Sequence, residues 1–280
     1  MVKKSDYSEP EVQASFSVMA ELMTILGEYR DNIVLVGGSV PPLLIPSAEK
    51  EYPGTLDIDL ALDFENISSI AYKTIVKTLE SRGYYQGSEQ PFIFYRDVEI
   101  KPGETTRIQV DLLGGEYGGT GTKHRHQRVQ DAQVRKARGC DLVFDAPLTV
   151  KLEGTLPNGA TNEVSIKIPS VGPFLVTKGM ALWGRLKEKD AFDIYFCCRY
   201  FPSGIEALAD AIKPVIGNRL AKEGLGKIKA RFNEVSGVGP VGVADFMELE
   251  DQEERGRIQR EAFEFVNKLM ELLEIDSFSG

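Results

Sequence analysis

Two aspartates stand one residue apart inside an apolar run, in the stretch TLDIDLALD at residues 55–63. Neighbouring carboxylates repel each other and resist burial, so a chain needs a reason to keep them there. Residues two apart on a strand point to the same face. Asp57 and Asp59 are therefore expected to project together from one side of a strand whose other side is apolar and buried.

A third carboxylate follows the same pattern. In RIQVDLL, residues 107–113, Asp111 lies opposite an apolar face. If the two strands are neighbours, three carboxylates converge, and such a cluster is stable only with a cation in it. Carboxylate oxygens suit Mg²⁺, so Asp57, Asp59 and Asp111 are predicted to hold one or two Mg²⁺ ions that bridge the phosphates of a nucleotide.

A glycine pair and a serine end the apolar strand that precedes these aspartates, in IVLVGGSVPPLLI at residues 33–45. Gly37 and Gly38 would let backbone N–H groups approach an anion closely, and the N-terminus of the helix expected behind them would favour negative charge. Ser39 would add a hydroxyl donor and could cap that helix. A phosphate site beside a metal site points to nucleotidyl transfer.

The order of these motifs resembles the nucleotidyltransferase superfamily, the polymerase-beta-like fold: GGS after an apolar strand, then TLDIDL, then QVDL. A later stretch, KGMALWGRLKEKDAFDIYFCCRY at 178–200, resembles the Lys-x-x-Ala-Leu, Arg and Lys-Asp-x-x-Asp segment of AbiEii-type nucleotidyltransferases, the toxins of type IV toxin–antitoxin systems. The resemblance covers residues 33–200. It implies an α+β fold with a mixed sheet flanked by helices, a helical C-terminal half, and the use of Mg²⁺ and an NTP.

The resemblance also implies roles for residues of the later stretch. Lys178 would contact the triphosphate, and either Asp190 or Asp193 would be the late acidic residue of the family. Arg185 lies seven residues after Lys178, so the two share a helix face and Arg185 is a second candidate for binding phosphate. A purely structural ion network among these side chains is the alternative. The spacing between Gly38 and Asp57 is several residues longer than the family usually shows, because of an insertion at 41–54 whose role stays open.

These residues predict a Mg²⁺-dependent enzyme that moves NMP from an NTP to an acceptor hydroxyl. The acceptor that we expect is RNA, a tRNA end. The resemblance implies a growth-inhibiting toxin or phage-defence protein with a cognate antitoxin. Two alternatives stay open: transfer to a small molecule such as an aminoglycoside, and a catalytically silent module that keeps the fold for binding.

A basic stretch at 123–138 is the candidate RNA site. It holds six Lys or Arg residues and both histidines of the chain against the single acidic Asp131. Contacts to an RNA backbone would be salt-sensitive, and a solvated helix face is the alternative. Residues 114–139 as a whole are rich in glycine and then basic, and are expected to form a mobile loop followed by a short helix.

The composition limits which partners and which cellular compartment are expected for the chain. A net charge of −9 argues against binding nucleic acid through the whole surface. Three cysteines, of which Cys197 and Cys198 are adjacent, provide neither a disulfide framework nor zinc spacing, so a reducing, cytoplasmic setting is expected. No window has the length and apolar content of a membrane span, and no membrane association is expected.

Hydrophobic periodicity places these motifs on elements. Strands are predicted at 32–36, 55–63, 92–100 and 106–115, with a hairpin around Asn158-Gly159. Helices are predicted at 10–30, 39–45, 65–83, 174–186, 189–200, 203–213 and 249–274, and SGVGPVGVAD at 236–245 is predicted to be a loop. Hairpins outnumber βαβ units, which favours α+β over a doubly wound sheet. The expected domains are a nucleotidyltransferase core at 1–172 and a helical domain at 173–280.

Overall fold

The computed structural model describes residues 3–115, 126–129 and 132–278. Their contacts form two compact units, each built from separate stretches of the chain. The sheet unit consists of Tyr7–Val40 and Gly54–Pro169, and the helical unit consists of Met1–Asp6, Pro41–Pro53 and Ser170–Gly280. The predicted α+β class, with a mixed sheet and a helical C-terminal half, is confirmed. The domain ranges 1–172 and 173–280 stay a prediction.

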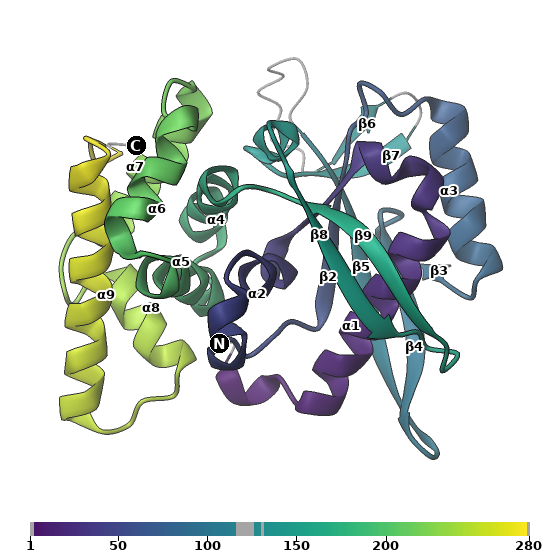
Figure 1. Ribbon diagram of the computed structural model, residues 1–280, viewed down its shortest axis with the longest axis horizontal. Coiled ribbons are helices and arrows are strands. Elements are labelled where there is room, and N and C mark those ends of the chain that lie inside the picture. Colours follow the sequence, from purple (N-terminus) through teal and green to yellow (C-terminus); the bar gives the residue numbers. More distant parts are fainter. Residues whose placement is uncertain (1–2, 116–125, 130–131, 279–280) are drawn as a thin grey trace. The chain divides into compact units, whose positions relative to one another are not determined.

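A mixed sheet forms the centre of the sheet unit (Figure 1). Its main strands run in the order β1–β2–β5–β4–β3, and β7 pairs with the end of β5 and with β6. β2 runs parallel to β5 and antiparallel to β1, while β4 runs antiparallel to β5. The strands are β1 (Ile33–Val36), β2 (Asp57–Leu62), β3 (Tyr85–Gln86), β4 (Ile93–Lys101), β5 (Glu104–Gly114), β6 (His126–Val129) and β7 (Ala132–Lys136).

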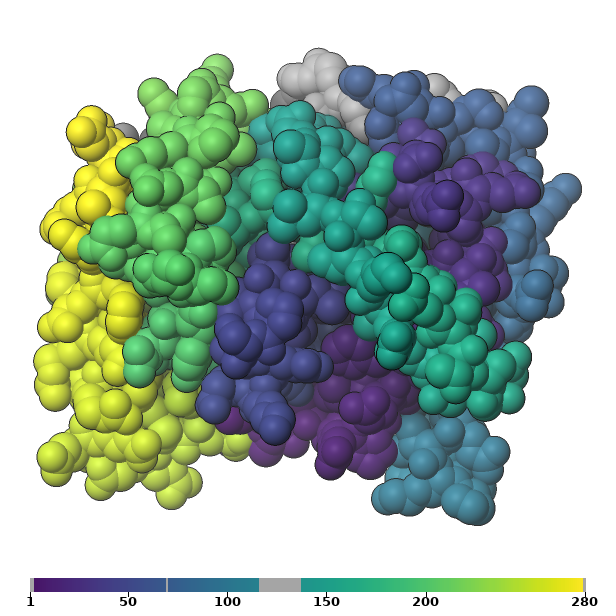
Figure 2. Space-filling view, viewed as in Figure 1, coloured from purple at the N-terminus to yellow at the C-terminus, as the bar shows by residue number. Residues whose placement is uncertain are grey.

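Helix α1 (Glu9–Ile25) packs against β4 and β5 and buries its apolar stripe there. The hairpin of β8 (Leu148–Thr155) and β9 (Thr161–Ile168) packs in turn on α1, and the space-filling view shows the teal hairpin across the purple helix (Figure 2). Its turn places Gly159 at a φ of +83°, which favours glycine. Ser68 caps helix α3 (Ser69–Ser81), and its hydroxyl accepts a hydrogen bond from the N–H of Ala71.

A second small core lies beside the predicted carboxylates. Ala61 comes two residues after Asp59, and Leu113 two residues after Asp111, so each shares a strand face with its aspartate. Both pack with Cys140, which opens the 3₁₀ turn η6 (Cys140–Phe144). The turn therefore closes over the carboxylate face of the sheet just past the aspartates.

The short helix expected within 114–139 is wrong. Residues 132–136 form a strand because the end of β5 offers them backbone partners, with Leu113 opposite Arg135 and Gly114 opposite Lys136. Residues 126–129 form a strand by pairing with residues 132–135 in turn. The expected mobile loop falls largely on residues 116–125, which lie outside the described part of the chain.

Helices make up the helical unit, and two glycines let two of them cross closely. A Cβ on Gly179 of α4 would overlap the carbonyl oxygen of Gly224 on α7 and lie 3.0 Å from the carbon of that carbonyl. The helices are α4 (Val171–Arg185), α5 (Glu188–Tyr200), α6 (Gly204–Ile212), α7 (Arg219–Arg231), α8 (Val238–Phe246) and α9 (Gln252–Leu272). No helix among the described residues has the length and apolar character needed to cross a membrane.

One part of this unit differs from the sequence prediction, and the structure describes another that the sequence left open. The predicted loop SGVGPVGVAD is wrong, because it forms α8: its Pro240 falls in the first turn, where a missing N–H costs nothing, and Gly239 packs against the ring of Phe232. The insertion has a defined structure, since residues 41–53 form most of α2 (Val40–Leu44) and the 3₁₀ segment η4 (Pro46–Glu51) and belong to the helical unit.

Candidate active site

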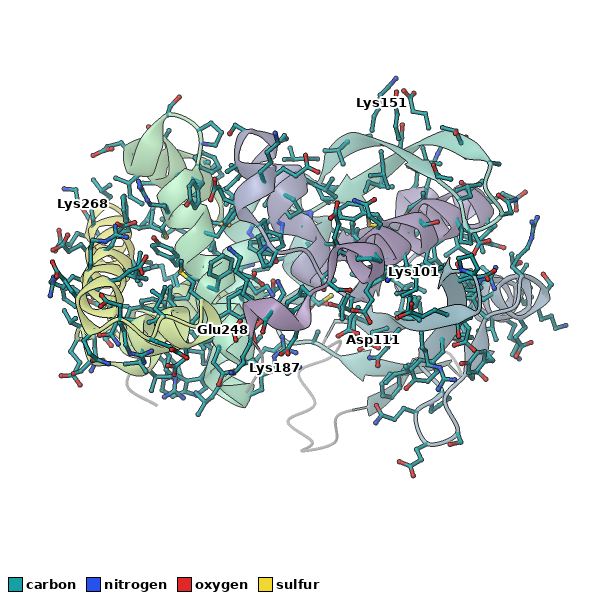
Figure 3. All side chains as sticks on the ribbon, turned by 90° about the horizontal axis from the view of Figure 1, so that it is seen from below. Lys101, Asp111, Lys151, Lys187, Glu248 and Lys268 are labelled. Atoms are coloured by element: carbon teal, nitrogen blue, oxygen red, sulfur yellow. The ribbon has the colours of Figure 1, made fainter. Side chains whose placement is uncertain are left out.

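The strand register places the predicted carboxylates on one face of the sheet. Asp59 lies directly opposite Asp111 across the parallel pair β2–β5, and Asp57 lies opposite Gln109. Asp57 is exposed, Asp59 is half-buried, and Asp111 is 2% exposed. Figure 3 labels the Asp111 side chain. Gln109 Nε2 donates to Asp111 Oδ1 at 2.7 Å, which fixes the orientation of that carboxylate. The two strands are neighbours, which was the condition for their carboxylates to converge, and the catalytic and metal-binding roles stay a prediction.

Gly37 lies against one of these carboxylates. Its φ of +72° is one that residues with a side chain rarely adopt. A Cβ at this position would overlap Asp59 Oδ2 and lie 2.8 Å from Asp59 Cγ. This closeness follows from the pairing of Val36 with Asp59 across β1 and β2. Glycine is therefore required at position 37 both by its backbone angle and by the carboxylate above it.

Residues Gly37–Ser39 form a 3₁₀ turn, η3, in which Gly38 and Ser39 are buried. The helix behind it, α2, has five residues, so only a small part of a helix macrodipole can develop there. The helix N-terminus is therefore expected to contribute less to anion binding than the sequence predicted. Anion binding at this turn would depend on its own backbone N–H groups.

Asp141 is a carboxylate that the sequence reasoning missed. It lies in η6, where a Cβ on Gly115 at the end of β5 would overlap its Oδ1. Burial first, and then the charges of Asp141 and Asp59, raise the pKa of the Cys140 thiol, so both carboxylates lie near that sulfur. The sequence around Asp141, GCDLVFD, has no strand or helix periodicity that could have pointed to this position.

The carboxylates on this face of the sheet are suited to Mg²⁺, because carboxylate oxygens are the usual protein ligands of this ion. Among the described residues, no three side chains of His, Cys, Asp or Glu are close enough to make a ready-formed metal site. Proteins that act on nucleotides commonly hold Mg²⁺ through one or two carboxylates together with the phosphates of the substrate. Asp59 and Asp111, opposite each other across β2–β5, are the residues that would hold it.

The later motif forms a buried ion network inside the helical unit. Lys178 Nζ on α4 is 3.1 Å from Asp190 Oδ1 and 2.5 Å from Asp193 Oδ2, both on α5. Arg185 forms a bidentate pair with Asp190, with Nε–Oδ2 at 2.7 Å and Nη2–Oδ1 at 2.8 Å. Burial alone would raise the pKa of Asp190, but Lys178 and Arg185 outweigh it and lower this pKa to about 2.

Lys178 and Arg185 thus form ion pairs with these aspartates, as the alternative of a structural ion network expects. Burial would lower the pKa of Lys178, yet Asp193 and Asp190 outweigh it and raise this pKa above its usual value. A phosphate would have to compete with two carboxylates for this ammonium, so the triphosphate contact stays a prediction. Both aspartates contact Lys178, and they differ in their further partners: Asp190 binds Arg185, while Asp193 binds a tyrosine and a second lysine.

Tyr52 and Lys189 are the further partners of Asp193, and the sequence reasoning missed both. Tyr52 Oη donates to Asp193 Oδ1 at 2.7 Å and accepts from Lys189 Nζ at 2.6 Å. Lys189 Nζ is also 4.4 Å from the centroid of the Tyr52 ring. Burial lowers the pKa of Lys189 to about 8. Since 137 residues separate Tyr52 from Lys189, no local pattern could have joined them.

The basic stretch is only partly within the described residues. Lys123, His124 and Arg125 lie outside them, whereas Arg138 is described and exposed. The backbone register places Arg135 of β7 opposite Leu113, two residues after Asp111 on β5. Part of the basic stretch thus extends the sheet from the strand that carries Asp111, and RNA binding stays a prediction.

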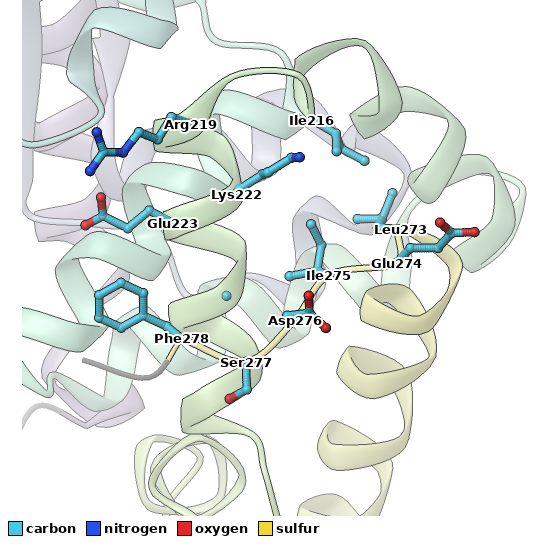
Figure 4. Close-up of a pocket in the computed structure, with 11 residues that line it drawn as sticks. Ile216, Arg219, Lys222, Glu223, Leu273, Glu274, Ile275, Asp276, Ser277 and Phe278 are labelled. Carbon is cyan, nitrogen blue, oxygen red and sulfur yellow. The ribbon is translucent and has the colours of Figure 1, made fainter.

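A pocket of about 510 Å³ lies entirely within the helical unit (Figure 4). The start of α7 and residues 273–278 line it, with Arg219 and Lys222 on the helix and Glu274 and Asp276 on the segment after α9. It contains none of the residues predicted for catalysis. Its charges are mixed, so they favour no single charge on a ligand.

Comparisons with known proteins give a distant likeness of structure. No protein-family model matches the chain, and no curated protein matches it in sequence. The crystal structure of JHP933 from Helicobacter pylori is similar over 95% of this chain and 94% of its own, with 12% identity and a TM-score of 0.47. A candidate nucleotidyltransferase from H. pylori is similar over 95% of this chain and 97% of its own, with 11% identity and a TM-score of 0.45. Likenesses at this level carry no conclusion about the function of this chain.

Proposed function

We propose that this chain is a Mg²⁺-dependent nucleotidyltransferase that moves NMP from an NTP to an acceptor hydroxyl. The observation that carries the proposal is the closeness of Gly37 to Asp59, which itself lies opposite Asp111. A turn suited to phosphate and a pair of carboxylates suited to a metal ion therefore meet within one unit of the fold. This combination is what nucleotidyl transfer needs.

Each residue has a role that follows from its place. Backbone N–H groups of Gly38 and Ser39 would bind phosphate oxygens, and Asp59 and Asp111 would hold Mg²⁺, with the exposed Asp57 beside them. A bound Mg²⁺ would neutralise phosphate charge and help align the nucleotide for in-line attack. Asp111, held in orientation by Gln109, would position the acceptor hydroxyl and accept its proton.

The acceptor that we propose is RNA, a tRNA end. The basic strand β7 continues the sheet from the end of β5, on which Asp111 lies. A nucleic-acid backbone is attracted by such a stretch, whereas a cationic small molecule such as an aminoglycoside is repelled by it. Growth inhibition and a cognate antitoxin are part of this proposal on the strength of the AbiEii resemblance.

One assay tests the reaction. The protein is incubated with each radiolabelled NTP, Mg²⁺ and total RNA, beside the variants Asp59→Asn and Asp97→Asn. Asp97 is the matched control: it is an aspartate of the same sheet, on β4, in an exposed ion pair with Arg107. We expect labelled RNA from the wild type and Asp97→Asn, and at least a ~100-fold loss in Asp59→Asn.

The other outcomes decide between the alternatives. Label in a small molecule alone would replace RNA as the acceptor and keep the chemistry. The absence of any transfer with Mg²⁺ or Mn²⁺ would refute the proposal in favour of a silent binding module. Equal losses in Asp59→Asn and Asp97→Asn would show that a change in the fold, rather than the site, controls the activity.

A further inference from the structure

The sheet face that carries the candidate carboxylates continues beyond them within the same unit. Residues two apart on β5 share a face, so Arg107 and Gln109 lie on the same side as Asp111. The strand register adds Tyr95 and Asp97 of β4, which lie opposite Gln109 and Arg107. The apolar residues that alternate with them on β5 are buried on the side where α1 packs. On the carboxylate side, by contrast, Asp97 and Arg107 are exposed.

Two tyrosine rings and a guanidinium group meet on this exposed part of the face, and we call Tyr85, Tyr95 and Arg107 the tyrosine platform. Tyr85 lies opposite Tyr95 across β3 and β4, and their ring centroids are 5.8 Å apart. Cζ of Arg107 is 5.5 Å from the centroid of the Tyr85 ring and 5.7 Å from that of the Tyr95 ring. Tyr85, on the edge strand β3, is 38% exposed, and Tyr95 is half-buried. The rings are therefore accessible from the surface of the sheet unit.

The charge of Arg107 is balanced beside the platform. Arg107 Nε donates to Asp97 Oδ1 at 3.0 Å, and Tyr85 Oη donates to the same oxygen at 3.0 Å. Asp97→Asn would still accept both hydrogen bonds, so the position of the rings does not depend on the charge of Asp97. Because the ion pair leaves no excess positive charge, a phosphate group is not favoured here. An uncharged, flat nucleobase can instead stack on a tyrosine ring or on a guanidinium plane.

The place of the platform suits an acceptor chain better than the NTP. Arg107 is four residues from Asp111 along β5, about 13 Å, and Tyr85 is two strands across from β5, about 10 Å. Tyr85 is thus about 16 Å from Asp111, a length of about five stacked nucleotides. The Gly37–Ser39 turn, where the NTP phosphates would bind, lies on the β2 side of β5, whereas the platform lies on the β4 and β3 side.

We propose that the tyrosine platform binds single-stranded RNA by stacking its bases and so holds an acceptor strand on the carboxylate face. Aromatic side chains exposed on a sheet are a common means of binding unpaired bases, since every base has a flat face that can stack. The role as the acceptor site rests on the proposed nucleotidyl transfer. RNA binding itself does not, and it is measured without Mg²⁺ or NTP.

The test measures the Kd of a short, unstructured, fluorescein-labelled oligoribonucleotide by fluorescence anisotropy. Tyr85→Leu removes the exposed ring, whereas Tyr85→Phe keeps it. Tyr29→Leu is the matched control, because Tyr29 is a half-buried tyrosine of the same unit in the 3₁₀ segment η2 (Gly27–Asn32), which contacts β1 and β9. We expect the Kd to rise about tenfold in Tyr85→Leu and to stay at the wild-type value in Tyr85→Phe and Tyr29→Leu.

An abasic oligomer of the same length separates base stacking from phosphate binding. It keeps the phosphates, so the wild type and Tyr85→Leu should bind it equally. For the oligomer with bases, the ratio of the Kd values of Tyr85→Leu and the wild type should be the same at about 50 and about 200 mM salt, because stacking releases no counterions. An equal loss for both oligomers, or a ratio that falls with salt, would overturn stacking as the mode of binding.

Three other outcomes would overturn the inference. They are a wild type that does not bind the oligomer, equal Kd values in Tyr85→Leu and the wild type, and self-association of the wild type that Tyr85→Leu abolishes without an effect on RNA binding. The last would make the platform a contact between copies of the chain.

The transfer assay keeps the two proposals apart. In Tyr85→Leu we expect KM for the RNA to rise about tenfold with kcat unchanged, since the platform lies away from the reacting groups. An unchanged KM would overturn the acceptor role and leave the proposed function intact. Ring-dependent RNA binding by a wild type without transfer would refute the proposed function and leave the RNA site in place.

Discussion

Replacing Gly37 by alanine would set a methyl group against the carboxylate of Asp59. The new Cβ would overlap Asp59 Oδ2 and lie 2.8 Å from Cγ and 3.1 Å from Cβ of the same side chain. Because Asp59 is on β2, whose backbone pairs on both sides with β1 and β5, its main chain cannot retreat. The side chain has to turn away, and the variant therefore tests the geometry of the site directly.

Two costs add in Gly37→Ala. A residue with a Cβ at a φ of +72° loses about 1–2 kcal/mol relative to glycine. Forcing a packed neighbour to move costs about 1–3 kcal/mol more. Gly103→Ala is the control, since Gly103 has a φ of +80° in the β4–β5 turn and no atom lies within 4 Å of the place that its Cβ would take. It should show the first cost alone.

Urea denaturation and the transfer assay measure the two consequences. Gly37→Ala should lose about 1–3 kcal/mol more unfolding free energy than Gly103→Ala. Its transfer rate should fall by at least ~100-fold, because a misplacement of about 1 Å at a reacting centre has that effect. The Gly103→Ala rate should equal that of the wild type. Equal stability and equal activity in the two variants would refute the argument that Gly37 makes room for Asp59.

Three further predictions concern the helical unit. Gly179→Ala should lower the unfolding free energy by about 1–3 kcal/mol, because its new methyl group would meet the α7 backbone. Gly184→Ala on the same helix should raise it by about 0.5–1 kcal/mol, because no atom lies within 4 Å of the place that its Cβ would take. Denaturant midpoints that move in the same direction in the two variants would contradict this. Burial lowers the pKa of Lys189 to about 8 in the folded protein, whereas its ordinary value in the unfolded chain is 10.5. Between pH 8 and 10 the unfolded chain therefore binds one more proton than the folded protein, and the free energy of unfolding should rise with pH by an amount on the order of 3 kcal/mol. Lys189→Met should lack this rise. The free energy of unfolding should fall by on the order of 2 kcal/mol as the pH drops from 4 to 2, where Asp190 becomes protonated. Asp190→Asn should be less stable at pH 7 but should lack this fall. If the variant lost as much stability between pH 4 and 2 as the wild type, the role given to Asp190 would be contradicted.

The part of the fold that the sequence predicted well is the part set by local burial. Alternation in TLDIDLALD and RIQVDLL identified two strands and the shared face of their aspartates, because one buried side imposes a period of two on each strand. The hairpin expected around Asn158-Gly159 is present, and Gly159 has the positive φ that glycine adopts without strain.

What escaped prediction depends on distant partners. Residues 132–136 form a strand because the end of β5 pairs with them, and nothing within their own basic sequence indicates this. SGVGPVGVAD has the composition of a loop, yet tertiary packing against Phe232 makes it a helix. Asp141 of the sheet unit lies against Gly115, and Tyr52 of the helical unit binds Asp193. Both partners are far along the chain, so neither residue leaves a periodic signal.

The interleaving of the two units has a consequence for how the chain is made. The sheet unit is finished at Pro169, whereas the helical unit needs Pro41–Pro53 from early in the chain and Ser170–Gly280 from its end. During synthesis, Tyr52 emerges long before α5, which supplies the Phe192 and Phe196 rings and the Asp193 carboxylate that will cover it. The nascent chain therefore carries an unsatisfied apolar segment between two finished strands until the last helices arrive. Neither unit can be cut out as one uninterrupted fragment, and a truncation at residue 170 would leave this segment without its binding surface.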